Sequence, residues 1–391
     1  MKTVTTKSAH PRIGFPWLLF AAFAAVAVWA SLTFPQIDVA DYAQYARDFL
    51  QPPLGHLWPP EYPFLSVGVF LLPWLLPFSY RLSFALLTVG ALAFLLRIGF
   101  RRWGRPWVVR TVGYLLLGSL FLFAQRYDIF AATAAFFSVL AARRGRYGAA
   151  WVGSFIGVWL KLFPVVLWPL LLLEEKRRTG SWRFDRLVWA VLGSIGVEGV
   201  QWLLAPQAVF SAFRYLAARP EEVGSLAADI AYYWSDPHFV TIYGSVNIVS
   251  VQAAVLSDIL LAGGMLAGLW ILWQMGMGRL SLCQAAVLAL SAEILSSKVF
   301  SAQYIIWLIP FWAREKWDGR LLLAGILTTI GYPFLYLSTQ SMAWVPAVFG
   351  LRDLLLIWWT VAAAKRFVAS SGIQASADPP RAAWTGKTPS I

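Results

Sequence analysis

The chain has 391 residues, of which 59% are apolar and only 13% are charged, and its mean hydropathy is +0.64. Charged residues usually make up about a quarter of a globular domain, so this composition excludes an ordinary water-soluble protein and indicates a polytopic membrane protein. The net charge of +13 does not indicate a nucleic-acid-binding protein, because the positive-inside rule gathers Lys and Arg on one membrane face. The apolar segments are continuous rather than alternating, so we expect an all-α helical bundle and no strands.

The N-terminal segment carries Lys2, Lys7 and Arg12 before an apolar run at residues 14–34. This run is too long for the apolar core of a signal peptide, and no small-residue cleavage pattern is clear. We therefore expect an uncleaved first membrane span with a cytosolic N-terminus.

A polar loop follows this span and ends in Glu61-Tyr62-Pro63. Carboxylates and prolines are costly near lipid, so their place at the mouth of a span predicts a site at the membrane surface. Asp38 and Asp41 are about one helical turn apart, so both side chains can face one cavity. A carboxylate near an apolar boundary tends to have a raised pKa, which suits a general base. The alternatives are a helix N-terminal cap and a charge in a solvated loop.

The later apolar segments alternate with basic clusters, which mark the cytosolic face. Residues 64–78 are short and carry two prolines, so we expect them to lie along the outer interface or to dip in and return. The other single segments expected in the membrane are 82–96, 109–124, 129–142, 187–204, 248–273, 281–296, 305–312, 321–337 and 348–364.

Two apolar runs are broken at a lysine. Residues 149–173 have basic clusters at both ends and contain Lys161-Leu162-Phe163-Pro164. Proline removes a helical hydrogen bond and a lysine at membrane depth needs a partner or water, so we expect two short helices that meet at an outer break, with Lys161 facing a wet cavity. Lys298 stands at a similar break before residues 305–312. For at least one lysine we favour contact with a phosphate or carboxylate.

The expected architecture is thus one domain over residues 1–368 with about twelve membrane segments, in which the first outer loop carries the active site. The two long outer loops are residues 35–80 and 205–247, approximately. Residues 369–391 are rich in Ser, Ala and Pro, and we expect a disordered cytosolic tail there.

Most of the polar residues that stand out lie on the expected outer face: Asp38, Asp41, Glu61, Arg126, Asp128, Lys161, Arg219, Lys298 and Gln303. A mouth that brings carboxylates and cations together can position an acceptor hydroxyl, remove its proton and bind an anionic leaving group. For Arg126 and Asp128, an ion pair that only holds a turn is an equally good explanation. Glu198 and Glu293 lie within spans, and we expect structural hydrogen bonds from them.

The sequence contains no motif that is typical of a cofactor-binding site. The single cysteine, Cys283, excludes an intramolecular disulfide, and we expect it to pack near a cytosolic helix end. The three histidines are far apart, and no phosphate loop, dinucleotide fingerprint or zinc motif is present, so we expect no cofactor and assign no residue to a metal.

Four motifs, in this order, resemble those of glycosyltransferase family 87, one of the GT-C membrane glycosyltransferases. The first combines Asp38 and Tyr42 with a later Glu61-Tyr62-Pro63-Phe64, where the family has proline at the place of Phe64. The others are Arg126-Tyr127-Asp128, Lys161-Leu162-Phe163-Pro164, and Lys298 with Ser301-Ala302-Gln303-Tyr304, where Ala302 replaces a family proline. A weaker match is Arg219 with Ser225, where Gly224 replaces a family glutamate. The matches cover roughly residues 36–310.

This resemblance implies an inverting transfer of a sugar, typically mannose, from a polyprenyl-phosphate donor to a glycolipid or glycan acceptor at the outer face of the plasma membrane. It implies that Asp38, ahead of Asp41, is the general base. The implied ligands of the donor phosphate are Lys161, Lys298, Arg126 and Arg219. The implied substrate-binding residues are Glu61, Tyr62, Asp128, Gln303 and Tyr304. Both termini are then cytosolic, the lipid bilayer is a partner and nucleic acid is not.

The main alternative is a secondary transporter or a flippase of lipid-linked sugars, because broken helices with a buried lysine are also found there. A transporter predicts inverted repeats and a site at mid-membrane, whereas these polar residues crowd one face and no repeat is clear. A third interpretation is an assembly partner with a degenerate site. The presence of Asp38, Lys161 and Lys298 argues against it.

Overall fold

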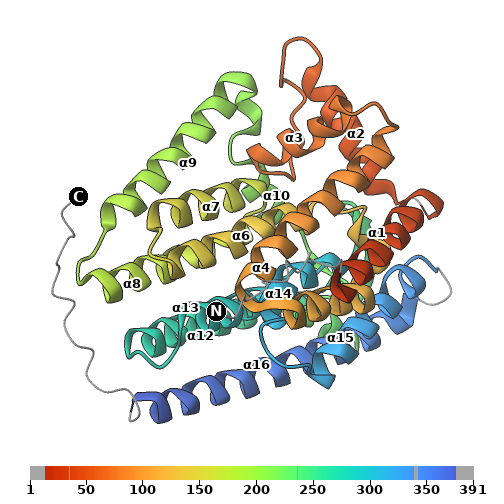
Figure 1. Cartoon of the computed structure of the whole chain (residues 1–391). Helices are drawn as coiled ribbons and strands as arrows, with labels where there is room; N and C mark the ends of the chain where they lie inside the picture. Colours follow the sequence, from red (N-terminus) through yellow and green to blue (C-terminus); the bar gives the residue numbers. More distant parts are fainter. Residues whose placement is uncertain (1–13, 35, 236, 339–341, 376–391) are drawn as a thin grey trace, which may run out of the picture.

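The computed structural model of the chain describes residues 14–375 apart from residues 35, 236 and 339–341. The structure is mostly helical, with 77% helix and 3% strand, as the sequence predicts for an all-α membrane protein. Figure 1 shows these helices packed side by side. Five helices in the described part are long and apolar enough to cross a membrane, so the protein is embedded in a lipid bilayer.

The first half of the bundle is a series of helices: α1 (Phe15–Thr33), α2 (Ile37–Leu50), α3 (Phe64–Leu71), α4 (Tyr80–Gly118), α5 (Leu120–Phe123), α6 (Asp128–Arg143), α7 (Tyr147–Leu160), α8 (Leu167–Thr179) and α9 (Phe184–Leu204). Helix α4 bends sharply at Gly104, whose φ of 69° suits glycine. The ring of Trp107 packs over Gly99, so the two arms of α4 fold against each other. The bend falls between the crossings predicted at residues 82–96 and 109–124.

The predicted break in the apolar run at residues 149–173 is confirmed. Helix α7 ends at Leu160, Lys161 has an extended backbone, and a short 3₁₀ turn, η2 (Phe163–Val166), leads into α8. Pro164 lies in this turn, where its missing N–H breaks no helical hydrogen bond. The break therefore carries the lysine out of the helical register and leaves its side chain free to face a cavity.

A small sheet follows α9, and the expectation that the chain has no strands is wrong here. The segment contains α10 (Ser211–Ala218), β1 (Glu221–Glu222), α11 (Leu226–Tyr232), β2 (His238–Ile242) and β3 (Ser245–Val249), with strand order β1-β3-β2. Strands β2 and β3 are antiparallel and joined by Tyr243 and Gly244, which both have positive φ. Two such residues form the tight turn that matches the twist of a hairpin. The strands are too short and too polar to register as apolar runs.

The last part of the chain returns to helices: α12 (Val251–Gly276), α13 (Leu282–Ser296), α14 (Ile305–Trp312), α15 (Gly319–Thr329) and α16 (Val345–Ala375). Short turns, η4 (Ala302–Tyr304) and η5 (Ile330–Leu335), precede α14 and follow α15. Helix α16 continues past residue 369, where the sequence predicts the start of a disordered tail, and the rest of that tail lies outside the described residues. Cys283 is buried in the first turn of α13, as expected.

Three basic segments of the chain lie at one end of the bundle. In Figure 1 the α8–α9 turn, the α12–α13 turn and the C-terminal end of α16 lie at the same side. The cations of these segments are Lys176, Arg177, Arg178, Arg279, Lys365 and Arg366. We call this the basic end. Helices α8 and α12 end at the basic end, and α13 begins there. The opposite ends of these helices carry the Lys161 break, Ser250 and Ser297, and we call that end of the bundle the site end.

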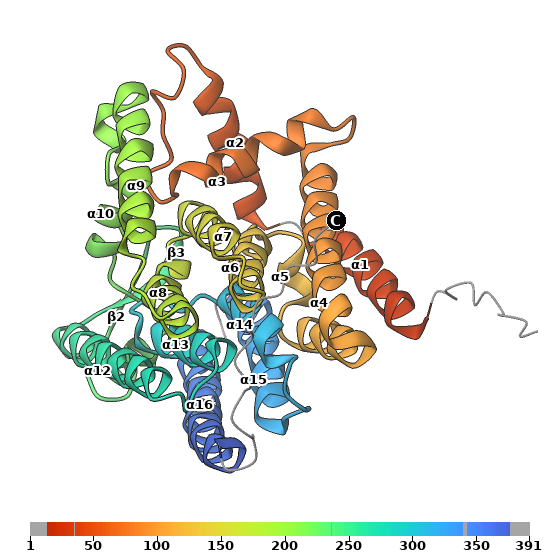
Figure 2. The ribbon, with the colours of Figure 1, turned by 60° about the vertical axis from the view of Figure 1, so that its left-hand side comes forward.

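Two helices have the surface that a lipid environment requires. Helices α9 and α12 lie at the outside of the bundle in Figure 2, and each buries only 11% of its most apolar stretch. Trp189 and Leu203 of α9 are 71% and 74% exposed, and Leu266 of α12 is 67% exposed. In water such a surface would drive aggregation, whereas in a bilayer it meets acyl chains. The core proper lies among α4, α6, α13 and α14.

Candidate active site

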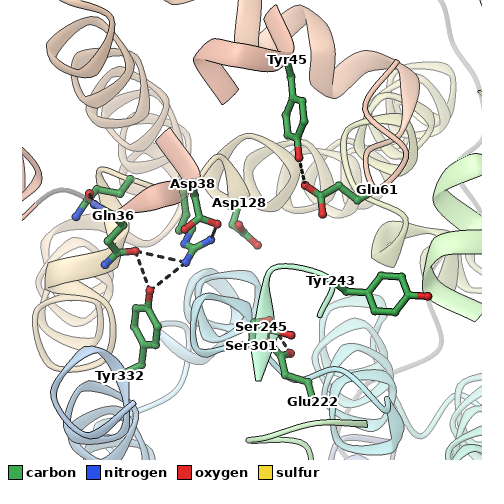
Figure 3. A network of polar contacts seen from close by, with 12 residues as sticks. Gln36, Asp38, Tyr45, Glu61, Asp128, Glu222, Tyr243, Ser245, Ser301 and Tyr332 are labelled. Carbon is green, nitrogen blue, oxygen red and sulfur yellow. Dashed lines mark hydrogen bonds and ion pairs between the residues drawn. The ribbon is translucent and has the colours of Figure 1, made fainter. Parts of the chain in front are cut away.

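A cavity of about 510 Å³ lies at the site end. It is lined by α2, the loop before α3, the α7–α8 and α13–α14 breaks, α10, the β-sheet and η5. The lining includes most of the predicted site residues: Asp38, Asp41, Glu61, Tyr62, Arg126, Lys161, Arg219, Gln303 and Tyr304. Figure 3 shows how polar side chains from these separate elements surround one region. The chain thus brings together residues that are up to about 270 positions apart in sequence.

The first group in the cavity is an ion pair between Asp38 and Arg126. Asp38 is the second residue of α2, whose N-cap is Gln36, so the interpretation of Asp38 as a helix cap is wrong. The start of α2 is fixed by Gln125, which accepts a hydrogen bond from the Gln36 backbone N–H at 2.8 Å. Arg126 also donates to Gln36 and to the Tyr332 hydroxyl, each at 3.4 Å. Figure 3 shows this group at one side of the cavity.

The second group is centred on Asp128, the first residue of α6. Its carboxylate accepts hydrogen bonds from Lys161 Nζ at 2.8 Å and from Trp307 Nε1 at 2.6 Å. Of the two interpretations of Arg126 and Asp128, the ion pair between them is wrong, because Arg126 pairs with Asp38 and Asp128 pairs with Lys161. Asp128 itself is fully buried, and Lys161 stands between it and the cavity.

Lys161 is also enclosed by aromatic rings. Its ammonium lies 4.9 Å from the ring centre of Tyr127, 5.0 Å from that of Tyr304 and 5.4 Å from that of Trp307. Trp307 is stacked between Tyr304 and Phe163, with ring centres 3.9 Å apart on each side. Ring faces attract a cation within about 6 Å, so these rings hold the charge in place without neutralising it.

The third group belongs to the small sheet and the α13–α14 break. Glu222 of β1 pairs with Arg219 at 3.2 Å and accepts a hydrogen bond from the Ser301 hydroxyl at 2.7 Å. Arg219 also donates to the hydroxyl of Ser245 in β3. Sequence analysis singled out Arg219 and included Ser301 in a motif, but it gave no role to Glu222 or Ser245. The available signal was the spacing of Arg219 and Glu222, because residues three apart on a turn can meet.

The fourth group is acidic. Tyr45 lies one turn after Asp41 on α2, and its hydroxyl donates to Glu61 at 2.9 Å. Partial burial and the neighbouring Glu61 raise the pKa of Asp41, as the sequence predicts for a carboxylate at an apolar boundary. Tyr215 of α10 also lines the cavity, and its hydroxyl donates to the carbonyl of Tyr243 at 2.8 Å. Burial and the nearby Glu61 raise the pKa of the Tyr215 hydroxyl. Within the described residues, neither Asp41 nor Glu61 forms an ion pair with a cation.

The three remaining predictions, for Lys298, Glu198 and Glu293, have mixed outcomes. Lys298 does not line the cavity, because its ammonium donates to the carbonyl of Ala217 at 2.8 Å and ties α10 to the α13–α14 break. Glu198 makes the expected structural hydrogen bond, to the Phe210 backbone N–H at 3.0 Å. Glu293 does not: it lines the cavity, and its buried Oε2 has no hydrogen-bond partner in the described part of the chain.

No family model, no curated protein and no solved structure matches this chain. Fold and site together define its class: a helical membrane protein with a charged, aromatic cavity at one end of the bundle. Over the described residues, no group of three or more His, Cys, Asp and Glu side chains is placed to hold a metal ion.

Proposed function

We propose that this protein is an inverting membrane glycosyltransferase of the GT-C type. It transfers a sugar, with mannose as the first candidate, from a polyprenyl-phosphate donor to a glycolipid or glycan acceptor at the outer membrane face. One observation carries the proposal: residues of all four sequence motifs, among them Asp38, Arg126 and Lys161, meet in one cavity at the site end. The basic end opposite would then face the cytosol.

The cations of the cavity suit an anionic leaving group. Arg126 and Lys161 both line the cavity, and each is held in place by an ion pair with a carboxylate. A donor phosphate entering the cavity competes with Asp38 for the N–H groups of Arg126, while the rings around Lys161 leave its other N–H bonds free. The isoprenoid tail stays in the bilayer, so only the head group has to enter.

The reaction follows from this placement. Asp38 accepts the proton of the acceptor hydroxyl, and the hydroxyl oxygen attacks the anomeric carbon of the donor sugar. The bond between this carbon and the phosphate oxygen breaks at the same time. The bonding electrons leave with the polyprenyl phosphate, whose growing charge is neutralised by Arg126 and Lys161. Attack from the face opposite the leaving group inverts the anomeric configuration. Competition of the phosphate for Arg126 loosens the Asp38–Arg126 pair, so donor binding prepares the base.

The test uses purified protein in lipid with radiolabelled polyprenyl-phosphate mannose and a membrane lipid extract. Wild type is compared with Asp38→Asn and with the control Asp48→Asn, because Asp48 lies on α2 outside the cavity lining. We expect label in a new lipid or glycan with wild type and control, and donor binding without transfer in Asp38→Asn. No donor binding by wild type would overturn the proposal. Donor bound and moved across a vesicle membrane without transfer would instead establish the flippase alternative.

A further inference from the structure

In the cavity lining, every described cation has a carboxylate partner, but several carboxylates have no cation partner. The described lining holds the cations Arg126, Lys161 and Arg219, and each is already paired with a carboxylate: Asp38, Asp128 and Glu222 respectively. Further lining carboxylates have no cation: Asp41, Glu61 and Glu293. Two of these, Asp41 and Glu61, are close enough for Glu61 to raise the pKa of Asp41, and Tyr45, one turn after Asp41 on α2, donates its hydroxyl to Glu61 at 2.9 Å. Tyr215 of α10 lines the same cavity and donates its hydroxyl to the carbonyl of Tyr243 at 2.8 Å. We call Asp41, Tyr45, Glu61 and Tyr215 the acidic group.

The acidic group has a definite chemistry as a binding surface. Carboxylate oxygens only accept hydrogen bonds when ionised, and a phenol both donates and accepts. Ligand hydroxyls that donate to the carboxylates are therefore complementary, and hydrogen bonds to a charged acceptor are the stronger kind. A phosphate or carboxylate at the same place meets two like charges and finds no cation free to offset them.

The position of the acidic group relative to Asp38 decides which substrate it meets. Asp41 follows Asp38 by one turn of α2, and both side chains line the cavity. The phosphate ligands Arg126 and Lys161 come from other elements, at the start of α6 and at the α7–α8 break. A sugar held by Asp41 thus lies within one helical turn of the base, and Figure 3 shows Tyr45 and Glu61 apart from Asp38 and Tyr332.

From this juxtaposition we propose that the acidic group is the acceptor subsite and that it takes a neutral, hydroxyl-rich sugar. It excludes acceptors that carry a negative charge next to the reacting hydroxyl. This inference rests on the proposed transfer reaction, and it narrows the acceptor from any glycolipid or glycan to those with an uncharged terminal sugar.

The experiment measures binding and transfer separately. Purified protein in lipid is titrated with octyl glucoside, octyl mannoside and octyl galactoside below their micelle-forming concentrations, and with the octyl glycosides of the matching uronic acids. These pairs differ only in a hydroxymethyl group or a carboxylate. We expect at least one neutral glycoside to bind, and its uronide to bind roughly tenfold or more weakly, because like charges repel in a partly buried site. Label transfer from polyprenyl-phosphate mannose is then followed with the same probes.

Three variants and a control locate the effect. Glu61→Gln keeps the size of the side chain and is expected to remove most of the discrimination against uronides. Glu61→Lys is expected to reverse this discrimination, so that uronides bind more tightly than neutral glycosides. Tyr45→Phe removes only one hydroxyl and is expected to lower the affinity for neutral glycosides a few-fold. Asp48→Asn is expected to change nothing.

Equal or tighter binding of uronides to wild type would overturn the inference. So would unchanged discrimination in both Glu61 variants, or binding of the donor with no binding of any neutral glycoside. Failure of the proposed transfer reaction has a different signature: the protein either does not bind the polyprenyl-phosphate donor, or binds it and moves it across a vesicle membrane without transferring label.

Discussion

The breaks at Lys161 and Lys298 are alike in sequence and different in the structure. Each places a lysine just after an apolar helix and before a short turn and a second apolar helix. Lys161 pairs with a fully buried carboxylate and faces the cavity, whereas Lys298 donates to a backbone carbonyl of α10 outside it. The break itself creates only an unpaired cation. What that cation does is decided by the group that another element brings to it.

The largest expected effect comes from removing the charge at the first break. Lys161→Met leaves Asp128 buried without its cation, and breaking a buried pair in this way costs about 3–5 kcal/mol. We expect a correspondingly lower free energy of unfolding in detergent, and loss of donor binding. The double variant Lys161→Met/Asp128→Asn should recover part of the stability but none of the donor affinity. Recovery of both would mean that Lys161 only holds the fold.

A smaller effect is expected at the other donor to Asp128. Trp307→Phe keeps a ring between Tyr304 and Phe163 but removes the N–H that lies 2.6 Å from the carboxylate. Leaving a buried acceptor short of one donor costs about 1–3 kcal/mol. Unfolding in urea should show this loss, while Lys161 keeps its pair. An unchanged midpoint would show that the tryptophan N–H contributes nothing to holding Asp128.

The second break should respond weakly. Lys298→Met removes one hydrogen bond to the carbonyl of Ala217, which is worth about 0.5–1.5 kcal/mol. We expect a small drop in thermal stability and a donor affinity within about twofold of wild type, in contrast to Lys161→Met. Loss of donor binding in this variant would place Lys298 at the phosphate and remove the difference between the two breaks.

The smallest effect concerns a carboxylate that has no cation. The pKa of Asp41 is raised by burial and by Glu61, so the folded protein keeps this proton to a higher pH than the unfolded chain. Stability from this group is present below its ordinary pKa of 3.8 and is lost as pH rises through the raised value. Asp41→Asn should therefore be a few tenths of a kcal/mol more stable than wild type at neutral pH, and equally stable below that range. Melting curves at several pH values check the sign.

The sequence predicts the breaks of the bundle better than its pairings. Lys161 and Pro164 indicate the α7–α8 break because a proline and a charge in an apolar run leave few other arrangements. The ion-pair alternative for Arg126 and Asp128 is wrong for a local reason: Asp128 is the first residue of α6, and residues two apart on a helix do not face each other. Glu222 and Tyr332 were missed because only the folded chain brings the small sheet and η5 to the cavity.

The short hairpin was missed for a different reason. Residues 238–242 are rich in β-branched and aromatic side chains and are followed by Tyr243-Gly244, which is a strand-and-turn signal. In a chain where long apolar runs dominate, five-residue strands contribute little to any window average. Mixed segments between spans therefore need to be read with soluble-protein rules.

Helix α12 has a length that ties the site end to the thickness of the bilayer. Its 26 residues rise about 39 Å, against a hydrocarbon core of about 30 Å. The helix must therefore lean, or extend its ends into the headgroup layer. A single residue, Ser250, joins it to β3, and the Ser250 hydroxyl caps the helix by accepting from the Ala253 N–H. A change in the tilt of α12 would move β3, the strand that carries Ser245. The geometry of the cavity is therefore expected to depend on the chain length of the surrounding lipids.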